Sequence, residues 1–270
     1  MPDAKVVTAL RRLRKDQRLI PFVGAGLSQP LNLPSWEKLI DFIAGQLGYD
    51  PDVYKLNGTY SQLAEHYINT KGVGPLRSEM DRLFNPSDQD IAASKTHELL
   101  VRLKVPLIYT TNYDRIIERA YKLHNSACHT IASIDDIGGA RQDATHVVKF
   151  HGAFSDDASL VLTESNYFDR LAFESALDIK LRADMLGRTL LFLGYSLSKE
   201  DINIRYLLYK LHKLRRQVRP DTPGEPSAYL TAFGAGEVQQ SLLKKWDVEV
   251  IELDPLDKTR STEAFLESLL

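Results

Sequence analysis

The sequence predicts an α/β fold, a Rossmann-like doubly wound parallel sheet with a helical insertion between its first two strands. Two observations predict it. Short apolar runs of the kind that form buried parallel strands end in small or polar residues. Helical patterns follow most of these runs. The chain has 270 residues, enough for one large domain with a well buried core. We therefore expect a single domain over residues 1–270, with the helical insertion at about 49–103.

Charge and composition argue against several classes of protein. The chain carries 34 Lys and Arg against 36 Asp and Glu, a formal net charge of −2, which implies no general attraction to nucleic acid or anionic membranes. It has no apolar run of 18 residues, and its charged N-terminal helical pattern does not resemble a signal peptide. The single Cys128 excludes an internal disulfide and a cysteine-based zinc site. We expect a soluble cytoplasmic protein.

The first predicted strand, Arg18–Val23, runs directly into Gly24-Ala25-Gly26-Leu27-Ser28. Glycines at such a junction let the backbone approach a ligand closely, and N–H groups at a helix start can bind phosphate. Gln29 stands where the dinucleotide fingerprint requires its third glycine, and no loop of the G-x-x-x-x-G-K-[ST] type is present. A tight strand-to-helix turn explains these glycines about as well as a ligand does.

A long helical region separates the first two predicted strands. Ser35 is a candidate N-cap for a helix with a continuous apolar face, and helical patterns continue over 60–68, 75–84 and 92–103. We expect this region to cover the ligand crevice. His66 and His97 lie in it, and for both a surface or capping role is favoured over catalysis.

Three further strands end in small or polar residues. The strand ends are Thr111-Asn112-Tyr113-Asp114 after Val105–Tyr109, His151-Gly152 after Thr145–Phe150, and Gly194-Tyr195-Ser196 after Thr189–Leu193. Ligands of open α/β sheets bind outside the carboxyl ends of the strands, so these residues can face one crevice. Taken singly, Asn112 and Asp114 are better explained as residues that cap a helix, and His151 is better explained as a structural histidine.

The rest of the chain continues the alternation. We expect a loop over 133–143, one long helix from Thr163 to about Leu186, a helix over 200–216, a surface loop over 220–224, and final strands over 228–233 and 248–253. The helix over 200–216 ends in basic residues that complement its dipole, so a nucleic-acid patch is not needed to explain them.

Together, the four strand ends resemble the motifs of the sirtuin-like (silent information regulator) family. The resemblance extends from about Arg18 to Leu253, and it is strongest to the bacterial branch that hydrolyses NAD in anti-phage defence. The phrases Pro34-Ser35-Trp36 and Thr163-Glu164-Ser165-Asn166-Tyr167 are similar to that branch.

This resemblance implies an NAD hydrolase with Asn112 and His151 as catalytic residues. Asn112 would position the nicotinamide ribose and the attacking water, and His151 would be the general base. NAD would be the substrate, and no metal would be required. The residues implied to bind NAD are Gly24, Ala25, Gly26, Ser28, Thr111, Asp114, Gly194 and Ser196.

The sequence departs from the deacylating sirtuins in one respect. Those enzymes carry a four-cysteine zinc ribbon after the His-Gly motif, and residues 152–193 contain no cysteine. Docking of an acyl-lysine peptide is therefore in doubt, and hydrolysis, which needs only water, is favoured. Protein deacylation or ADP-ribosyl transfer is the alternative reaction, and an NAD or ADP-ribose sensing module is the non-enzymatic alternative.

The resemblance also implies that the activity is controlled from outside this domain, because constant NAD hydrolysis would be toxic. We expect a homo-oligomer and a regulatory partner protein or fused sensor domain, with no direct contact to nucleic acid or membrane. The sequence leaves open whether NAD or NADP is preferred.

Overall fold

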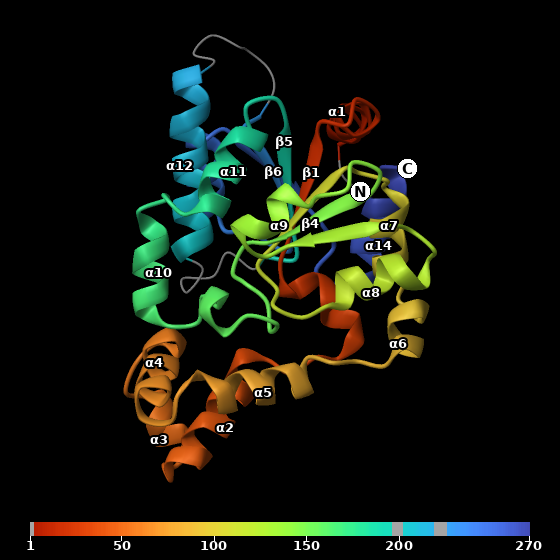
Figure 1. Cartoon of the computed structure of the whole chain (residues 1–270). Coiled ribbons are helices and arrows are strands. Elements are labelled where there is room, and N and C mark those ends of the chain that lie inside the picture. Colours follow the sequence, from red (N-terminus) through yellow and green to blue (C-terminus); the bar gives the residue numbers. More distant parts are fainter. Residues whose placement is uncertain (1–2, 196–201, 219–225) are drawn as a thin grey trace.

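The computed structural model describes residues 3–195, 202–218 and 226–270. Its strands form one seven-stranded sheet in the order β3-β4-β2-β1-β5-β6-β7, and every neighbouring pair is parallel (Figure 1). The strands are β1 (Leu19–Val23), β2 (Leu107–Thr110), β3 (Cys128–Ile131), β4 (Thr145–Lys149), β5 (Thr189–Leu193), β6 (Ala228–Ala232) and β7 (Val248–Glu252). The predicted doubly wound parallel sheet is confirmed.

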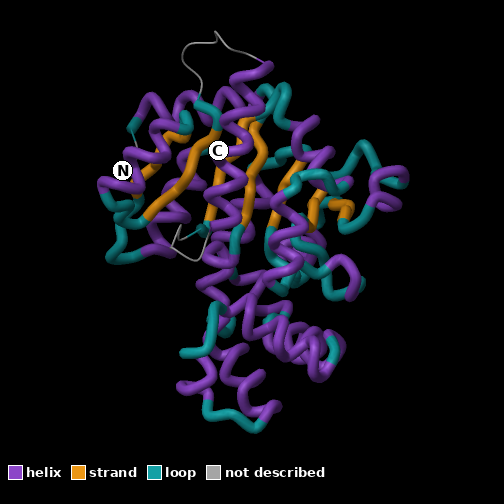
Figure 2. Tube along the Cα trace, turned by 90° about the vertical axis from the view of Figure 1, so that its left-hand side faces the viewer, coloured by secondary structure: helices purple, strands orange, loops and turns teal. Residues whose placement is uncertain are grey.

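Helices connect the strands and cover both faces of the sheet, as parallel connections require (Figure 2). They are α1 (Ala4–Lys15), α2 (Trp36–Leu47), α3 (Pro51–Lys55), α4 (Tyr60–Lys71), α5 (Val73–Leu83), α6 (Asp88–Ala93), α7 (Lys95–Arg102), α8 (Ile116–Leu123), α9 (Ile134–Gly138), α10 (Glu164–Leu171), α11 (Ala176–Asp184), α12 (Ile202–Val218), α13 (Glu237–Lys245), α14 (Lys258–Ser268) and the 3₁₀ helices η1 (Ala25–Leu31) and η2 (Asp157–Ser159). Within the described ranges, no helix is long and apolar enough to cross a membrane.

Alternate residues of the central strand β1 supply two separate cores, because successive side chains of a strand point to opposite faces. Leu19 and Val23 pack with residues of α1, α7, α8 and α14 on one face. Ile20 and Phe22 pack with residues of α11, α12 and α13 on the other. All five residues of β1 are buried. The sheet is therefore rigidly held at the centre, where the strand ends of interest lie.

The helices between β1 and β2 divide into two groups. Residues of α2 to α5 form a third core with Tyr113, Phe154, Leu160 and Leu162, and this lobe projects from the end of the sheet to which β1 runs (Figures 1 and 2). α6 and α7 instead contribute to the core on one face of the sheet. Ser35 caps α2 as expected, since its Oγ accepts a hydrogen bond from the N–H of Lys38 at 3.5 Å.

Three sequence-based expectations were wrong. The stretch 133–143, expected to be a loop, contains the short helix α9, at whose start Asp136 accepts a hydrogen bond from the N–H of Ser133 at 2.8 Å. No strand was expected between 116 and 145, but β3 forms the sheet edge beside β4. Three of its four residues are only half-buried, so it lacks the apolar run by which the other strands are recognised. The long helix expected from Thr163 to about Leu186 is two helices, because Phe173 has φ of 60° and Ser175 starts α11 with a capping box.

Two shorter stretches also differ from, or lie outside, what the sequence predicts. The helical pattern over 92–103 is interrupted at Ser94, which lies between α6 and α7 and occupies the N-cap position of α7 without a capping hydrogen bond from its side chain. The surface loop expected at 220–224 lies outside the described residues.

Candidate functional site

The four strand ends identified in the sequence lie side by side at one edge of the sheet. They belong to β4, β2, β1 and β5, which are consecutive in the strand order. Val23 is in register with Thr110 on one side and with Leu193 on the other, and Thr110 is in register with Lys149. Because neighbouring strands are about 4.8 Å apart, the segments that follow these residues start in one row. This edge includes the point where successive strands begin to be added on the opposite side of β1, the usual ligand crevice of such sheets.

The glycines after β1 and β5 pack directly on each other. The N–H of Gly26 donates to the carbonyl of Gly194 at 2.9 Å, and a Cβ at either Gly24 or Gly26 would lie 2.7 Å from that same oxygen. Gly194 has φ of 75°, and a Cβ there would lie 2.3 Å from the nitrogen of Leu27. The contact between the two turns thus requires these glycines, whatever ligand they meet.

Tyr195 ties three strand ends together and was not among the site residues expected from the sequence. Its hydroxyl lies 3.0 Å from Thr111 Oγ1 and donates to the carbonyl of Val23 at 3.1 Å. Thr111, expected to bind NAD, therefore already has a side-chain partner. Ser196, expected beside the adenosine, lies outside the described residues.

Asn112 and Asp114 differ in what their side chains contact. A carboxylate oxygen of Asp114 accepts the N–H of Ile116 at 2.9 Å and so caps the start of α8, and burial raises the pKa of this carboxyl. Asn112 is 7% exposed and its backbone N–H donates to Thr110 Oγ1, but its amide group has no hydrogen-bond partner among the described residues. The capping explanation holds for Asp114 and fails for Asn112.

Lys149 holds the loop that carries Asn112 and Asp114, a role that was not predicted from the sequence. Its side chain is 1% exposed, donates to the backbone carbonyl of Asp114, and lies 3.3 Å from the carboxylate of Glu118. A lysine at the end of a strand, directly after Val147 and Val148, was the available signal, because a buried charge requires a partner.

His151 is packed by aromatic rings but keeps its nitrogens free. Its ring stacks on Phe150 at 6.0 Å between centroids and meets Tyr167 edge-on at 5.7 Å. Neither ring nitrogen has a hydrogen-bond partner in the described part of the chain. Burial and the positive charge of Arg170 lower the pKa of His151 to about 3, so the imidazole is neutral at physiological pH.

Gly152 has φ of 86°, and a Cβ there would lie 2.2 Å from the carbonyl oxygen of Ser159.

His97 is not at the surface, which rules out the first of the two roles expected for it, a surface or a capping role. It is fully buried, with Nδ1 at 2.8 Å from Ser94 Oγ and Nε2 at 3.4 Å from the hydroxyl of Ser28. Burial lowers its pKa to about 4. The neutral imidazole of His97 thus orients the hydroxyl of Ser28. This contact could not be predicted from the sequence, because Ser28 and His97 are 69 positions apart.

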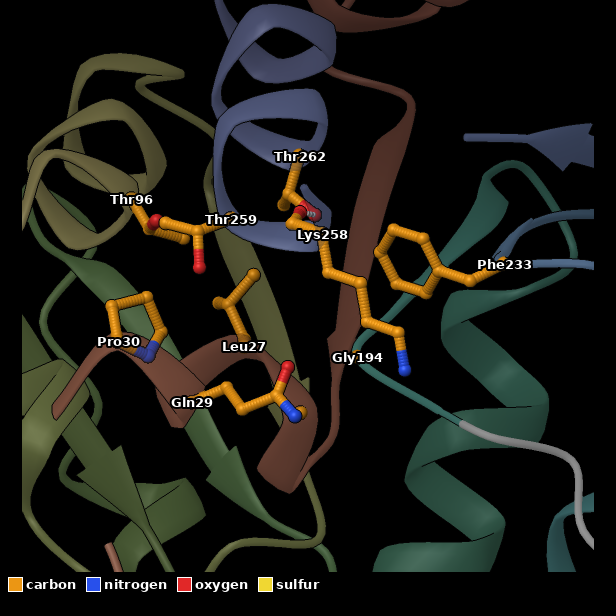
Figure 3. A pocket seen from close by; sticks show the side chains of 10 residues that line it. Leu27, Gln29, Pro30, Thr96, Gly194, Phe233, Lys258, Thr259 and Thr262 are labelled. Carbon is orange, nitrogen blue, oxygen red and sulfur yellow. Dashed lines mark hydrogen bonds between the residues drawn. The ribbon is translucent and has the colours of Figure 1, made fainter. Parts of the chain in front are cut away.

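A small hollow adjoins the glycine turn on the side of α14 (Figure 3). Gly26 and Gly194 of the expected set line it, together with Gln29, Phe233 and Lys258. The Lys258 side chain extends toward the Gly194 turn, and its Nζ lies 5.6 Å from the ring centroid of Phe233. Asn112 and His151 do not line it, so the hollow and the two expected catalytic residues occupy different parts of the edge.

Comparison with known proteins identifies the family. The family model described as SIR2-like domain matches residues 106–251, which is more than half of the chain. The chain belongs to the SIR2-like domain family. The matched range contains the Asn112, His151 and Gly194 strand ends of this SIR2-like chain, and the resemblance inferred from the sequence is confirmed.

Among its relatives is the NAD(+) hydrolase ThsA of Bacillus cereus (strain MSX-D12), 30% identical over 192 residues, or 70% of this chain and 39% of the relative. Defense-associated sirtuin 2 of Bacillus subtilis is 25% identical over 223 residues, 80% of this chain and 22% of the relative. A solved structure titled "The Structural basis of Sirtuin Substrate Affinity" is 14% identical and covers 99% of both chains with a TM-score of 0.43. The SIR2-like chain therefore spans about two fifths of the first relative and less of the second.

Proposed function

We propose that this SIR2-like chain hydrolyses NAD to nicotinamide and ADP-ribose. One observation carries the proposal: the amide of Asn112 and the ring nitrogens of His151, on adjacent strand ends, lack partners among the described residues. The polar side chains of Ser28, Thr111 and Asp114 around them are hydrogen bonded. Two unpaired polar groups at the ligand edge of an otherwise satisfied site are suited to a substrate. The relatives named NAD(+) hydrolase support the choice of substrate.

The chemistry requires orientation more than a strong base. Cleavage breaks the bond between nicotinamide nitrogen and ribose C1′; the electron pair leaves with nicotinamide, and the oxygen of water bonds to C1′. The transition state has oxocarbenium character, so the amide of Asn112 contributes by fixing the ribose and the water. His151 accepts a hydrogen bond from water or a ribose hydroxyl and takes up the proton that water loses. Its low pKa makes it a weak base, which suits a reaction driven mainly by departure of the leaving group.

The dinucleotide would lie across the row of strand ends. We assign its pyrophosphate and ribose groups to Gly24, Ala25, Gly26 and the His97-oriented hydroxyl of Ser28, with Thr111, Asp114, Gly194 and Ser196 completing the site. The N–H of Gly26 is bonded to Gly194, so other donors of this turn would meet the phosphates. The proposed reaction requires no metal.

The experiment is to incubate the purified chain with NAD and measure free nicotinamide and ADP-ribose by liquid chromatography. Hydrolysis predicts equal amounts of both products without added peptide. Nicotinamide release only in the presence of an acetyl-lysine peptide would favour deacylation. NAD binding without either product would favour a sensing module.

We further propose that the chain works as one NAD-binding domain in an oligomer, under the control of a partner or a further domain, in anti-phage defence. The name of the defense-associated relative supports the setting. The helices from α3 to α7 would transmit the effect of assembly to the site, because they lie in the chain between the Gly24 and Asn112 strand ends. Light scattering and NAD hydrolysis across a dilution series test this: constant specific activity from a monomer would refute it.

A further inference from the structure

Helix α10 presents two side chains, one turn apart, to the strand end that carries His151. The ring of Tyr167 meets His151 edge-on at 5.7 Å. The guanidinium carbon of Arg170 lies 4.2 Å from the ring centroid of Phe150, and that ring stacks on His151 with an interplanar angle of 26°. The ring of Phe150 thus contacts both the guanidinium of Arg170 and the imidazole of the proposed site.

The position of Arg170 is fixed from the opposite side. Its Nη2 lies 2.9 Å from the carboxylate of Asp178, and its Nη1 donates to Ser175 Oγ at 2.6 Å. Ser175 and Asp178 are also the capping box of α11, so both anchors are held by a helix start. The side chain of Asp178 is 1% exposed. The arginine is therefore clamped between a buried carboxylate and an aromatic face.

Stability alone is a weak explanation for this arrangement. Burying an ion pair costs both charges their hydration, and apolar residues of similar size often stabilise a protein as well or better. Arginine is also the cation suited to stacking on an aromatic face while donating in the ring plane, which lysine cannot do. The geometry suits a role in holding the stack.

We propose that Arg170 is a positioning residue of the site: clamped by Asp178 and Ser175, it packs on Phe150 and thereby fixes the ring of His151 at the end of β4. The consequence for NAD cleavage rests on the proposed function; the consequence for the His151 ring does not.

Charge supports the same role. The groups that face His151 from α10 are the phenol of Tyr167 and, across Phe150, the guanidinium of Arg170, whose partner Asp178 comes from α11. The positive charge of Arg170 acts with burial to lower the pKa of His151. The ring is thus held in place as a neutral acceptor.

The test uses the double variant Arg170→Gln with Asp178→Asn, which removes both charges and so leaves no uncompensated buried carboxylate. We expect kcat for NAD to fall about tenfold while KM stays within about twofold, because binding groups elsewhere are untouched. Arg170→Lys keeps the charge but cannot stack, and we expect it to recover less than half of the lost kcat. Arg182→Gln, on the exposed side of α11, is the matched control and should equal the parent.

A second readout is independent of catalysis. The Cε1–H resonance of His151, assigned by its loss in His151→Gln, should shift at pH 7 in the double variant because the ring stack is released, and should stay in place in Arg182→Gln. If the parent does not hydrolyse NAD, the proposed function fails and this resonance still tests Arg170. The inference is overturned if the His151 resonance of the double variant is the same as that of the parent. It is also overturned if the parent is active and the double variant has the same kcat. A lower melting temperature with both unchanged would assign Arg170 a purely structural role.

Discussion

Lys149→Met should be among the most damaging single substitutions near the site. The ammonium group is buried and lies 3.3 Å from Glu118, whose side chain is 14% exposed. Methionine has a similar length but no charge, so the substitution leaves the carboxylate of Glu118 buried without its partner. Removing one member of a buried pair typically costs about 3–5 kcal/mol. The free energy of unfolding should fall by about that amount.

The double variant Lys149→Met with Glu118→Gln separates this electrostatic cost from the second contact of the lysine. It removes both charges, and we expect its free energy of unfolding to lie only about 1–2 kcal/mol below that of the parent. This remaining loss comes from the missing hydrogen bond to the Asp114 carbonyl. Urea unfolding followed by circular dichroism measures both variants. Because the loop that carries Asn112 is no longer held from below, NAD turnover should stay reduced in the double variant even at full folding. A loss under about 1 kcal/mol in Lys149→Met, or a double variant no more stable than it, would refute the reasoning.

Three further outcomes are expected. Gly194→Ala should cost more than about 2 kcal/mol, because of the positive φ and the 2.3 Å approach to the nitrogen of Leu27, whereas Gly187→Ala, with nothing within 4 Å of its Cβ, should be close to neutral; equal melting temperatures would contradict this. The pKa of His97 is about 4 in the folded state, which is below its value in the unfolded state. The stabilisation from keeping this histidine neutral is therefore complete above about pH 6.5. On acidification toward pH 4, the free energy of unfolding falls by up to about 1.4 kcal/mol per pH unit. His97→Gln should flatten that slope in urea unfolding between pH 7 and 5, and an unchanged slope would argue against it. Since the pKa of His151 is lowered to about 3, NAD turnover at pH 5.5 should remain at least about half of its value at pH 8, and a fall centred near pH 6.5 would show that this histidine is not shielded.

The sequence predicted the centre of the fold because parallel strands leave a local signal. β1, β2 and β5 are fully buried and mostly apolar, β4 contains the buried pair Val147 and Val148, and the residues that follow each of these strands lie where the sheet ends. Neighbouring strands then bring these residues together without any further information. The edge strand β3 was missed because its half-buried Cys, His and Thr side chains give no such run.

The supporting contacts could not be predicted, since they join residues far apart in the chain or depend on where a helix ends. Lys149 bonds to a carbonyl 35 residues away, and Ser28 meets His97 at a separation of 69. The clamp on Arg170 depends on the break at Phe173, where the helix expected to continue ends instead. Helical periodicity gives the face of a residue but not its partner, so a surface or capping role was expected for His97, which is fully buried.

Asn112 offers the most direct test of the proposed NAD hydrolysis. Its amide has no protein partner among the described residues, so Asn112→Ala should leave the melting temperature within about 2 °C of the parent. Release of nicotinamide from NAD should fall at least about a hundredfold, because the ribose and water lose their orienting group. Asn57→Ala, which removes an exposed amide from the helical lobe, is the control and should keep full activity. A folded Asn112→Ala protein that releases nicotinamide at the parent's rate would contradict the assignment of this strand end as the catalytic site.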